Sequence, residues 1–303
     1  MSERVLIEFD KAGAEWFIVG FMAGDEQMIK VFNEGKSPHV VTGMLCTGAS
    51  EELVLKEHKA VGAITDPTLI ESIRRSQVPE IFSADLLFLP RIFSIRQCFK
   101  KANHGLNYYM KARRFSEETE MDERDCKRVI DLYLKQAYVN IPLWWESVKR
   151  DLRINNRTLF NCFGRKRRFL EAWGDELFKQ AFAFLPQSTN VDAVNEAMIK
   201  SYNDDWLMAF MDLLAQTHDS ITFQALINDY KRLAAGCIKI DEYMSPQMEY
   251  GGRKFRLGTE MKIGKSWGQL KSIPLTKDID KLAKDIRETV ETLDLATTPS
   301  KVA

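Results

Sequence analysis

The sequence lacks the features that mark several large classes of protein. Its 43 basic and 43 acidic residues leave a formal net charge of zero, which excludes a polybasic, histone-like protein but leaves room for a local basic cleft. The five cysteines form no CxxC or Cys/His zinc spacing, and their odd number argues against a disulfide framework. We therefore expect small buried thiols. No uncharged apolar run reaches the roughly 18 residues that span a bilayer.

Targeting signals and repeats are also missing. The first residues, MSERVLIEFD, have the pattern of neither a secretory signal nor a transit peptide. We therefore expect a cytoplasmic protein with no membrane partner, in the host cytoplasm if the chain is viral. The composition, with 45% hydrophobic and 28% charged residues, is typical of soluble globular proteins. The length of 303 residues is enough for one large domain or two modest ones.

Hydrophobic periodicity predicts short strands among many helices. A strand over 5–10 ends on Asp10, and residues 213–224 have a hairpin pattern with Asp219 at its turn. A charged linker is expected over 116–125. The expected helices cover 14–32 in two pieces, 50–60, 67–76, 92–110, 124–138, 142–153, 172–200, 226–243 and 278–293, and a late strand covers 254–263.

Two acids form the first candidate site. If one sheet brings Asp10 at a strand end beside Asp219 at a turn, their carboxylates can hold two Mg²⁺ ions. Such a pair of ions stabilises both the attacking and the leaving oxygen of an in-line phosphoryl displacement. Because Asp is common at strand ends and turns, the spacing alone favours a structural role.

A basic and aromatic stripe forms the second candidate site. Arg96, Lys100, His104 and Tyr108 recur every four residues, which places them along one face of an α-helix. Two cations followed by an imidazole and a phenol suit a triphosphate with a base stacked at its far end. A solvated basic face explains the charges but does not require the two rings in register, so the stripe by itself leaves both interpretations open.

The segment RQCFKKANHGLNYY (96–109) resembles the fingers helix of family A DNA polymerases, the group of bacterial DNA polymerase I and many phage replicases. Other segments resemble further motifs of that family in the same order, over roughly residues 5–270. They are the first carboxylate motif and its helices (10–39), a Gly-Arg-rich segment (158–170), the second carboxylate motif (217–220) and a terminal strand with a Gly-x-x-Trp ending (261–267).

The resemblance implies an α+β right-hand polymerase, with a small antiparallel palm sheet, mainly helical fingers, and no thumb or exonuclease domain. It implies palm segments at 1–24 and 156–277, and fingers at 25–155 with an insertion near 45–90. A C-terminal helix and tail (278–303) lie beyond the resemblance. We expect that helix either to dock a partner or to pack on the palm.

The resemblance also implies an activity, that of a DNA-directed DNA polymerase which adds deoxynucleotides to a primer 3′ end. Asp10 and Asp219 would bind two Mg²⁺ ions, with Mn²⁺ as a possible substitute, aided by the backbone carbonyl of Lys11. Lys100 would meet the leaving pyrophosphate and is the candidate general acid.

Further matched residues would contact the nucleotide and the DNA. Arg96 and His39 would hold the triphosphate, and His104 would stack on the base. Glu15, near Tyr108, would crowd the sugar 2′ position and exclude ribonucleotides. The residues implied to contact primer–template DNA are His218 at the primer end, and Gln187, Lys179, Arg165 and Arg167 at the duplex backbone.

Several positions depart from the family pattern. Ala12-Gly13 stand where a Ser-Gln pair would contact the minor groove, and Phe17 stands where the family has Arg. His104 replaces a stacking Phe or Tyr, and Tyr109 replaces the Gly that usually follows the Tyr. The losses at 12, 13 and 17, with Ala183 in place of an Asn, support an alternative in which the chain is a non-catalytic, DNA-binding palm–fingers subunit of a replication complex.

The resemblance starts so close to the first residue that we expect the C-terminal half of a split, phage-type polymerase. A separate N-terminal polypeptide would then supply the thumb, the exonuclease or both. A third interpretation is another phosphoryl transfer, for example on RNA. Glu15 and Tyr108 argue against RNA synthesis, because a pair of residues that excludes ribonucleotides would have no use in an enzyme that makes RNA. Outside the motifs, His58 is expected at the surface and Trp144-Trp145 in the core.

Overall fold

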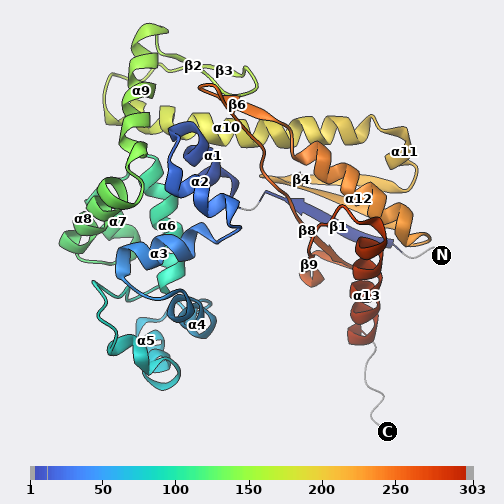
Figure 1. Cartoon of the computed structure of the whole chain (residues 1–303), viewed down its shortest axis with the longest axis horizontal. Helices are drawn as coiled ribbons and strands as arrows, with labels where there is room; N and C mark the ends of the chain where they lie inside the picture. The colour runs from blue at the N-terminus through green and yellow to red at the C-terminus, as the bar shows by residue number, and fades with distance from the viewer. Residues whose placement is uncertain (1–3, 12, 298–303) are drawn as a thin grey trace. The chain divides into compact units, whose positions relative to one another are not determined.

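The structure is a computed structural model that describes residues 4–11 and 13–297, with the backbone alone for 294–297. The described chain divides into two compact units. Unit 1 comprises the described residues of 1–14, 188–249 and 254–303, and unit 2 comprises 15–187 and 250–253. Helices and antiparallel strands mix along the chain, so the expected α+β class is confirmed (Figure 1). In the ranges described, no helix is both long and apolar enough to cross a bilayer.

Unit 1 is built on a five-stranded sheet whose neighbouring strands all run antiparallel. The first strand of the chain is central, and its neighbours come from the last third of the sequence. The expected N-terminal strand and the expected hairpin are therefore both confirmed. In sheet order, the strands are β4 (Met211–Thr217), β5 (Ser220–Leu226), β1 (Arg4–Asp10), β8 (Glu260–Gly264) and β9 (Lys271–Ile273).

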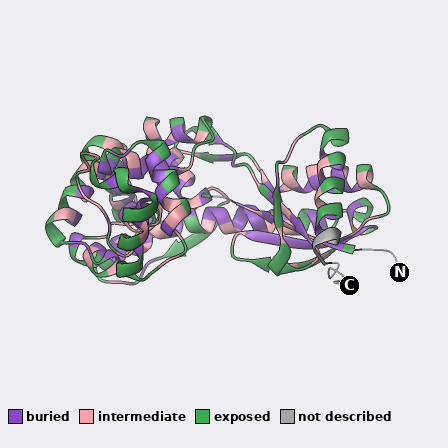
Figure 2. Ribbon diagram, turned by 90° about the horizontal axis from the view of Figure 1, so that it is seen from below, coloured by how far each residue is buried: buried purple, intermediate pink, exposed green. Residues whose placement is uncertain are grey.

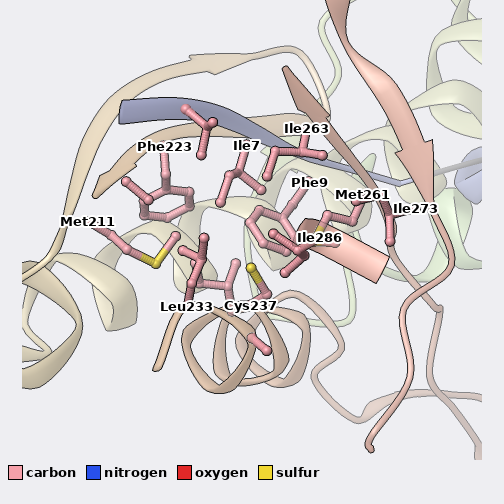
Figure 3. Close-up of a cluster of buried hydrophobic side chains, with 14 of the residues drawn as sticks. Ile7, Phe9, Met211, Phe223, Leu233, Cys237, Met261, Ile263, Ile273 and Ile286 are labelled. Atoms are coloured by element: carbon pink, nitrogen blue, oxygen red, sulfur yellow. The ribbon is translucent and has the colours of Figure 1, made fainter. Parts of the chain in front are cut away.

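Strand β1 separates an apolar face from a polar one, because successive side chains point to opposite sides of a sheet. Ile7 and Phe9 are fully buried and, with strand neighbours such as Ile263, pack against Leu233 and Cys237 of helix α12 (Tyr230–Met244) (Figure 3). Glu8 and Asp10 occupy the alternate positions and are only half-buried. The apolar face thus anchors the strand, and the polar face presents its carboxylates.

The C-terminal helix α13 (Ile279–Thr297) adds Leu282, Ile286 and Val290 to the same core. Of the two expectations for this helix, packing on the sheet unit is therefore the one observed. Figure 2 shows how buried residues line the interior of each part of the chain while exposed residues follow the outer turns of the helices. The expected burial of Cys46, Cys98, Cys126 and Cys237 and of Trp144 and Trp145 is confirmed, whereas the fifth cysteine, Cys162, is only half-buried.

Unit 2 is mainly helical. Helix α10 (Asp175–Tyr202) is divided between the units after Gln187.

The expected helices 92–110 and 226–243 are shorter than predicted, and the expected strand 254–263 is two separate strands. The remaining elements are α1 (Ala14–Ala23), α2 (Glu26–Asn33), α3 (Pro38–Thr47), α4 (Glu51–Val61), α5 (Pro67–Gln77), η1 (Pro79–Phe82), α6 (Ile95–Asn107), α7 (Ala112–Thr119), α8 (Glu123–Leu132), η2 (Tyr133–Ala137), α9 (Asn140–Ile154), β2 (Thr158–Phe160), β3 (Lys166–Arg168), α11 (Asp205–Met208), β6 (Met248–Tyr250), β7 (Arg253–Phe255) and η3 (Trp267–Gln269).

The expected charged linker is wrong at both ends, because helix α7 extends to Thr119 and helix α8 begins at Glu123. The α7 residues Ala112, Phe115 and Thr119 are buried at helical spacing. On the exposed side, Arg113 pairs with Glu117 over 3.2 Å, an (i, i+4) pair that supports a helix. The charges that suggested a linker form the solvated face of a helix.

Candidate functional site

Asp10 and Asp219 lie next to each other at one end of the unit 1 sheet. Asp10 is the last residue of β1 and is paired in register with Ser220, the first residue of β5. Asp219 occupies the two-residue turn before Ser220, and its carbonyl accepts a hydrogen bond from the Lys11 backbone N–H over 3.3 Å. The sheet register therefore brings together two carboxylates that are far apart in the sequence.

The charge around Asp10 is only partly balanced. Burial raises the pKa of Asp10 above its usual value, and the negative charges of Asp219 and Glu8 raise it further. Lys262 opposes them, with its Nζ 2.8 Å from Glu8 Oε1 and 3.8 Å from Asp10 Oδ2. The arrangement therefore favours a further cation beside Asp10.

The donor set fits a hard divalent cation. Among the described residues, no cluster of three or more His, Cys, Asp or Glu side chains forms a closed metal cage. Mg²⁺ typically binds through one or two carboxylates and keeps water or substrate phosphate oxygens as its other ligands. Asp10 and Asp219, whose side chains are 29% and 28% exposed, match that pattern because they leave room for those oxygens.

Lys11 and His218 flank the two acids. The Lys11 side chain turns inward, its Nζ donates to the Leu257 carbonyl over 3.0 Å, and burial lowers its pKa to about 8. Its own carbonyl, the atom expected to help bind metal, accepts a long 3.4 Å hydrogen bond from Ala14 N–H. His218 adopts a left-handed backbone (φ 52°) in the hairpin turn, and its Nδ1 lies 3.2 Å from Asp219 Oδ1.

The basic stripe lies in unit 2, on helix α6. Ser94 caps this helix by accepting a 3.2 Å hydrogen bond from Gln97 N–H. Arg96 is half-buried, Lys100 and His104 are exposed, and Tyr108 follows directly at the C-terminal end. The opposite face packs into the core through Ile95, Cys98, Phe99, Ala102 and Leu106.

All four stripe residues line one open cavity of about 1000 Å³. Lys101 from α6 and His58 and Lys59 from α4 line it too. The cavity therefore carries positive charge from two helices, one of which lies in the segment predicted to be an insertion.

Glu15 and Tyr108 meet at the C-terminal end of α6. The Tyr108 hydroxyl donates to Glu15 Oε2 over 2.8 Å, and burial with the nearby Glu15 charge raises the pKa of Tyr108 well above its usual value. His104 Nε2 lies 3.9 Å from the same carboxylate, and Gln187 Nε2 donates to it over 3.4 Å. Three predicted site residues thus converge on Glu15 Oε2, which belongs to a fourth.

Tyr109 has a left-handed backbone, with φ 70°. Such a conformation costs a non-glycine residue about 1–2 kcal/mol, which explains why Gly suits this position. Here the ring packs edge-on against Trp145, with centroids 4.9 Å apart, and Lys111 Nζ lies 3.5 Å from the ring centroid. These aromatic and cation–π contacts offset the backbone strain.

His39 and Phe17 are both held by neighbours in unit 2. Asn103 Nδ2 lies 3.1 Å from His39 Nδ1, and because an amide nitrogen only donates, this ring nitrogen accepts. Burial, followed by the positive charges of Arg96 and Lys100, lowers the pKa of His39 to about 4, so the ring is neutral near pH 7. Phe17 packs edge-on with Phe32, with centroids 5.1 Å apart, so it serves an aromatic cluster.

The predicted duplex contacts are spread over the end of unit 2. Arg165 and Arg167 are exposed in or beside the β2–β3 hairpin, and Gln187 is exposed on α10, where Lys179 is half-buried. Arg167 also donates to Gln180, and its guanidinium carbon lies 4.7 Å from the Phe169 ring centroid. These two contacts orient the exposed guanidinium group of Arg167.

Sequence reasoning missed several residues at these sites. Glu8 and Lys262 border Asp10, and the two-residue alternation of β1 could have placed Glu8 on the same face. His58 was expected at the surface but is half-buried, with Nε2 3.2 Å from Arg96 Nη1. No sequence signal links His58 to Arg96, because the contact joins two separate helices.

Comparison with known proteins shows the family to which the chain is similar. The family model for DNA polymerase family A matches residues 92–269, more than half of the chain. The thermostable DNA polymerase I of Thermus thermophilus is 23% identical over 269 residues, covering 87% of this chain and 27% of that protein. The thermostable DNA polymerase I of Thermus aquaticus is 23% identical over 227 residues, covering 73% of this chain and 22% of that protein.

The fold is also shared with a solved structure, the POL domain of Pol1 from M. smegmatis in complex with DNA primer-template and dNTP. That likeness has a TM-score of 0.65 at 16% identity and covers 88% of this chain and 40% of that one. The chain spans about a quarter of the length of the curated relatives above. On the strength of the family match, the chain belongs to DNA polymerase family A.

Proposed function

We propose that this chain carries the catalytic residues of a DNA-directed DNA polymerase that extends a primer 3′ end with deoxynucleotides. The observation that carries the proposal is the pairing of Asp10 with Ser220, which sets Asp10 beside Asp219 in a partly uncompensated acidic site. A sheet register that gathers two acids from distant parts of the sequence suits two-metal phosphoryl transfer better than a purely structural role.

In this proposal unit 1 corresponds to the palm, and the helical part of unit 2 to the fingers. Asp10 and Asp219, with the Lys11 carbonyl, would hold two Mg²⁺ ions. When bound, these ions supply charge neutralisation for the attacking and leaving oxygens. His218 would lie beside the primer terminus.

The α6 stripe would bind the incoming nucleotide. Arg96 would bind the triphosphate as a cation, and His39, which is neutral near pH 7, would act as a hydrogen-bond donor. Lys100 would hold the leaving pyrophosphate and hand it a proton, while His104 would stack on the base. Glu15 and Tyr108 would restrict the 2′ position of the sugar.

The remaining proposed contacts are to duplex DNA. Gln187, Lys179, Arg165 and Arg167 would bind the primer–template backbone, where charge neutralisation supplies much of the affinity. Because the chain covers only part of its relatives' length, we include in the proposal a further polypeptide that supplies thumb or exonuclease functions.

Primer extension tests the proposal, using a DNA primer–template, Mg²⁺ and four deoxynucleotides, with the chain alone and with any co-purifying polypeptide. Asp10→Asn and Asp219→Asn should each reduce extension about 1,000-fold, because each removes a metal ligand. Asp205→Asn, at an exposed acid of α11 in the same unit, is the matched control. Retained DNA binding without extension in any mixture would replace the proposal with the non-catalytic subunit.

A further inference from the structure

Helix α4 belongs to the segment predicted to be an insertion, and it is built onto the start of the α6 stripe helix. Glu57 Oε2 accepts the Ile95 backbone N–H over 3.0 Å, in the first turn of α6. The side-chain amide of Gln97 donates to the Gly62 carbonyl just after α4. These contacts fix where α4 meets the N-terminal end of α6.

A buried ion pair locks this arrangement. Arg74 of α5 donates to Glu57 Oε1, and the two side chains are 4% and 0% exposed. Arg74 also donates to the Pro90 and Phe93 carbonyls, over 2.6 Å and 2.9 Å, in the segment that leads into α6. Because both charged side chains are paired and hydrogen-bonded, they hold α4, α5 and the segment before α6 in one defined arrangement.

His58 connects the helix cap to the stripe. Its Nδ1 lies 2.9 Å from Ser94 Oγ, and its Nε2 lies 3.2 Å from Arg96 Nη1. A guanidinium can only donate, so Nε2 accepts from Arg96 and the ring is neutral, with its proton on Nδ1 and directed to Ser94. The imidazole therefore restrains Arg96 relative to the α6 N-cap.

Lys59, the next residue of α4, lines the same cavity as Arg96 and Lys100. Of the described residues that line it, four are Lys or Arg, and Glu118 alone is acidic. Glu118 is already paired, since Arg114 Nε donates to it over 2.9 Å. The cavity is therefore strongly cationic, and part of that charge comes from α4.

We propose that helix α4 is part of the binding surface for the polyphosphate tail of the incoming nucleoside triphosphate. In this assignment His58 is a positioning residue that orients Arg96, and Lys59 is a direct cationic contact. A chain of linked phosphates suits four clustered cations, because it carries several negative charges over a short length. The assignment rests on the function proposed above for α6, and extends it to α4.

The test is binding of inorganic tripolyphosphate to the full chain, measured by calorimetry without DNA or metal. Tripolyphosphate lacks base and sugar, so it reports on the phosphate surface alone. We expect His58→Leu to weaken binding about 5- to 10-fold, because Arg96 loses its acceptor. We expect Lys59→Met to weaken it about 3-fold and to reduce its salt dependence.

Two further variants separate positioning from a general structural effect. His58→Gln should restore most of the affinity, because its amide oxygen can accept from Arg96. In an Arg96→Leu background, His58→Leu should have no further effect. Lys56→Met is the matched control for Lys59→Met, since Lys56 is an exposed lysine of the same helix and pairs with Glu80 away from the cavity.

Each outcome decides the assignment. It is overturned if the wild-type chain does not bind tripolyphosphate, if the α4 variants bind as wild type, or if His58→Leu weakens binding equally without Arg96. Primer extension that continues unchanged in the α4 variants leaves the polymerase proposal standing while removing α4 from it. Tripolyphosphate binding that depends on His58, together with no primer extension in any mixture of the chain and co-purifying polypeptides, supports the α4 site and rejects the polymerase proposal.

Discussion

The Tyr108 hydroxyl donates a 2.8 Å hydrogen bond to Glu15 Oε2, which joins the end of helix α6 to the start of helix α1. The bond fixes the phenol and the carboxylate as one rigid group. If this group restricts the 2′ position of the bound sugar, both its bulk and its charge act against a ribose hydroxyl.

We expect Glu15→Ala to increase ribonucleotide use at least about 10-fold relative to deoxynucleotide use, because the carboxylate that crowds the 2′ position is removed. The measurement is the ratio of kcat/KM for UTP to that for dTTP opposite one template base. Tyr108→Phe keeps the ring and loses only the hydrogen bond, so its ratio should stay closer to that of the wild type. An unchanged ratio in Glu15→Ala would remove Glu15 from sugar selection.

Lys262 contributes a positive charge beside Asp10, and its removal should tighten metal binding. The Lys262 Nζ lies 3.8 Å from Asp10 Oδ2, so a metal ion that binds Asp10 competes with this ammonium group. The Lys262→Met substitution removes that competition. We expect Lys262→Met to bind Mn²⁺ about 3- to 10-fold more tightly, roughly 1 kcal/mol for a partly exposed pair, as measured by the loss of the free Mn²⁺ electron paramagnetic resonance signal. Lys254→Met changes an exposed lysine in the same unit and should leave the affinity unaltered. Equal affinity in both variants would contradict the prediction.

His39 should make the protein sensitive to acid. Its pKa is about 4 in the folded chain and near 6.5 when exposed, so the unfolded state takes up a proton first as the pH falls. The stability due to neutral His39 is therefore complete above about pH 6.5 and declines as the pH falls toward 4. Between pH 7 and 4, wild type should lose up to about 3 kcal/mol more unfolding free energy than His39→Asn, measured by urea denaturation. Parallel pH dependence of the two proteins would reject this role for His39.

Arg74 and Arg75 provide a matched test of the buried lock. Arg74 pairs with fully buried Glu57, whereas Arg75 pairs with Glu71 in solvent, with side chains 64% and 58% exposed. Arg74→Met should cost about 3–5 kcal/mol of unfolding free energy, because it leaves a buried carboxylate without its partner. Arg75→Met should cost less than about 1 kcal/mol. Similar urea midpoints for the two variants would show that the buried pair does not hold α5 in place.

The sequence predicts local placement better than contacts between elements. Local patterns place Asp10 at a strand end and Asp219 in a hairpin turn, whereas the shared site of the two acids is implied only by the family resemblance. Helix α7 is partly missed because its charged face conceals the buried spacing of Ala112 and Phe115. In each of these cases, the decisive information lies within a few neighbouring residues.

The contacts that the sequence could not predict depend on packing between distant segments. His58 reaches Arg96 only because the Glu57–Arg74 pair fixes α4 and α5 against the start of α6. Tyr109 tolerates a left-handed backbone only because Trp145, from another helix, packs against its ring. Neither helix propensity nor hydrophobic periodicity carries information about contacts between segments that are far apart in the sequence.

The central position of β1 in the sheet has a consequence for folding during synthesis. Its partners β5 and β8 emerge from the ribosome only after all of residues 15–187, roughly 10 to 40 s after Asp10 at about 5–20 residues per second. Throughout that interval the strand's apolar residues Val5, Ile7 and Phe9 have no sheet to join. The acid at the centre of the proposed chemistry is therefore made well before the strands β5 and β8 that hold it in its final position.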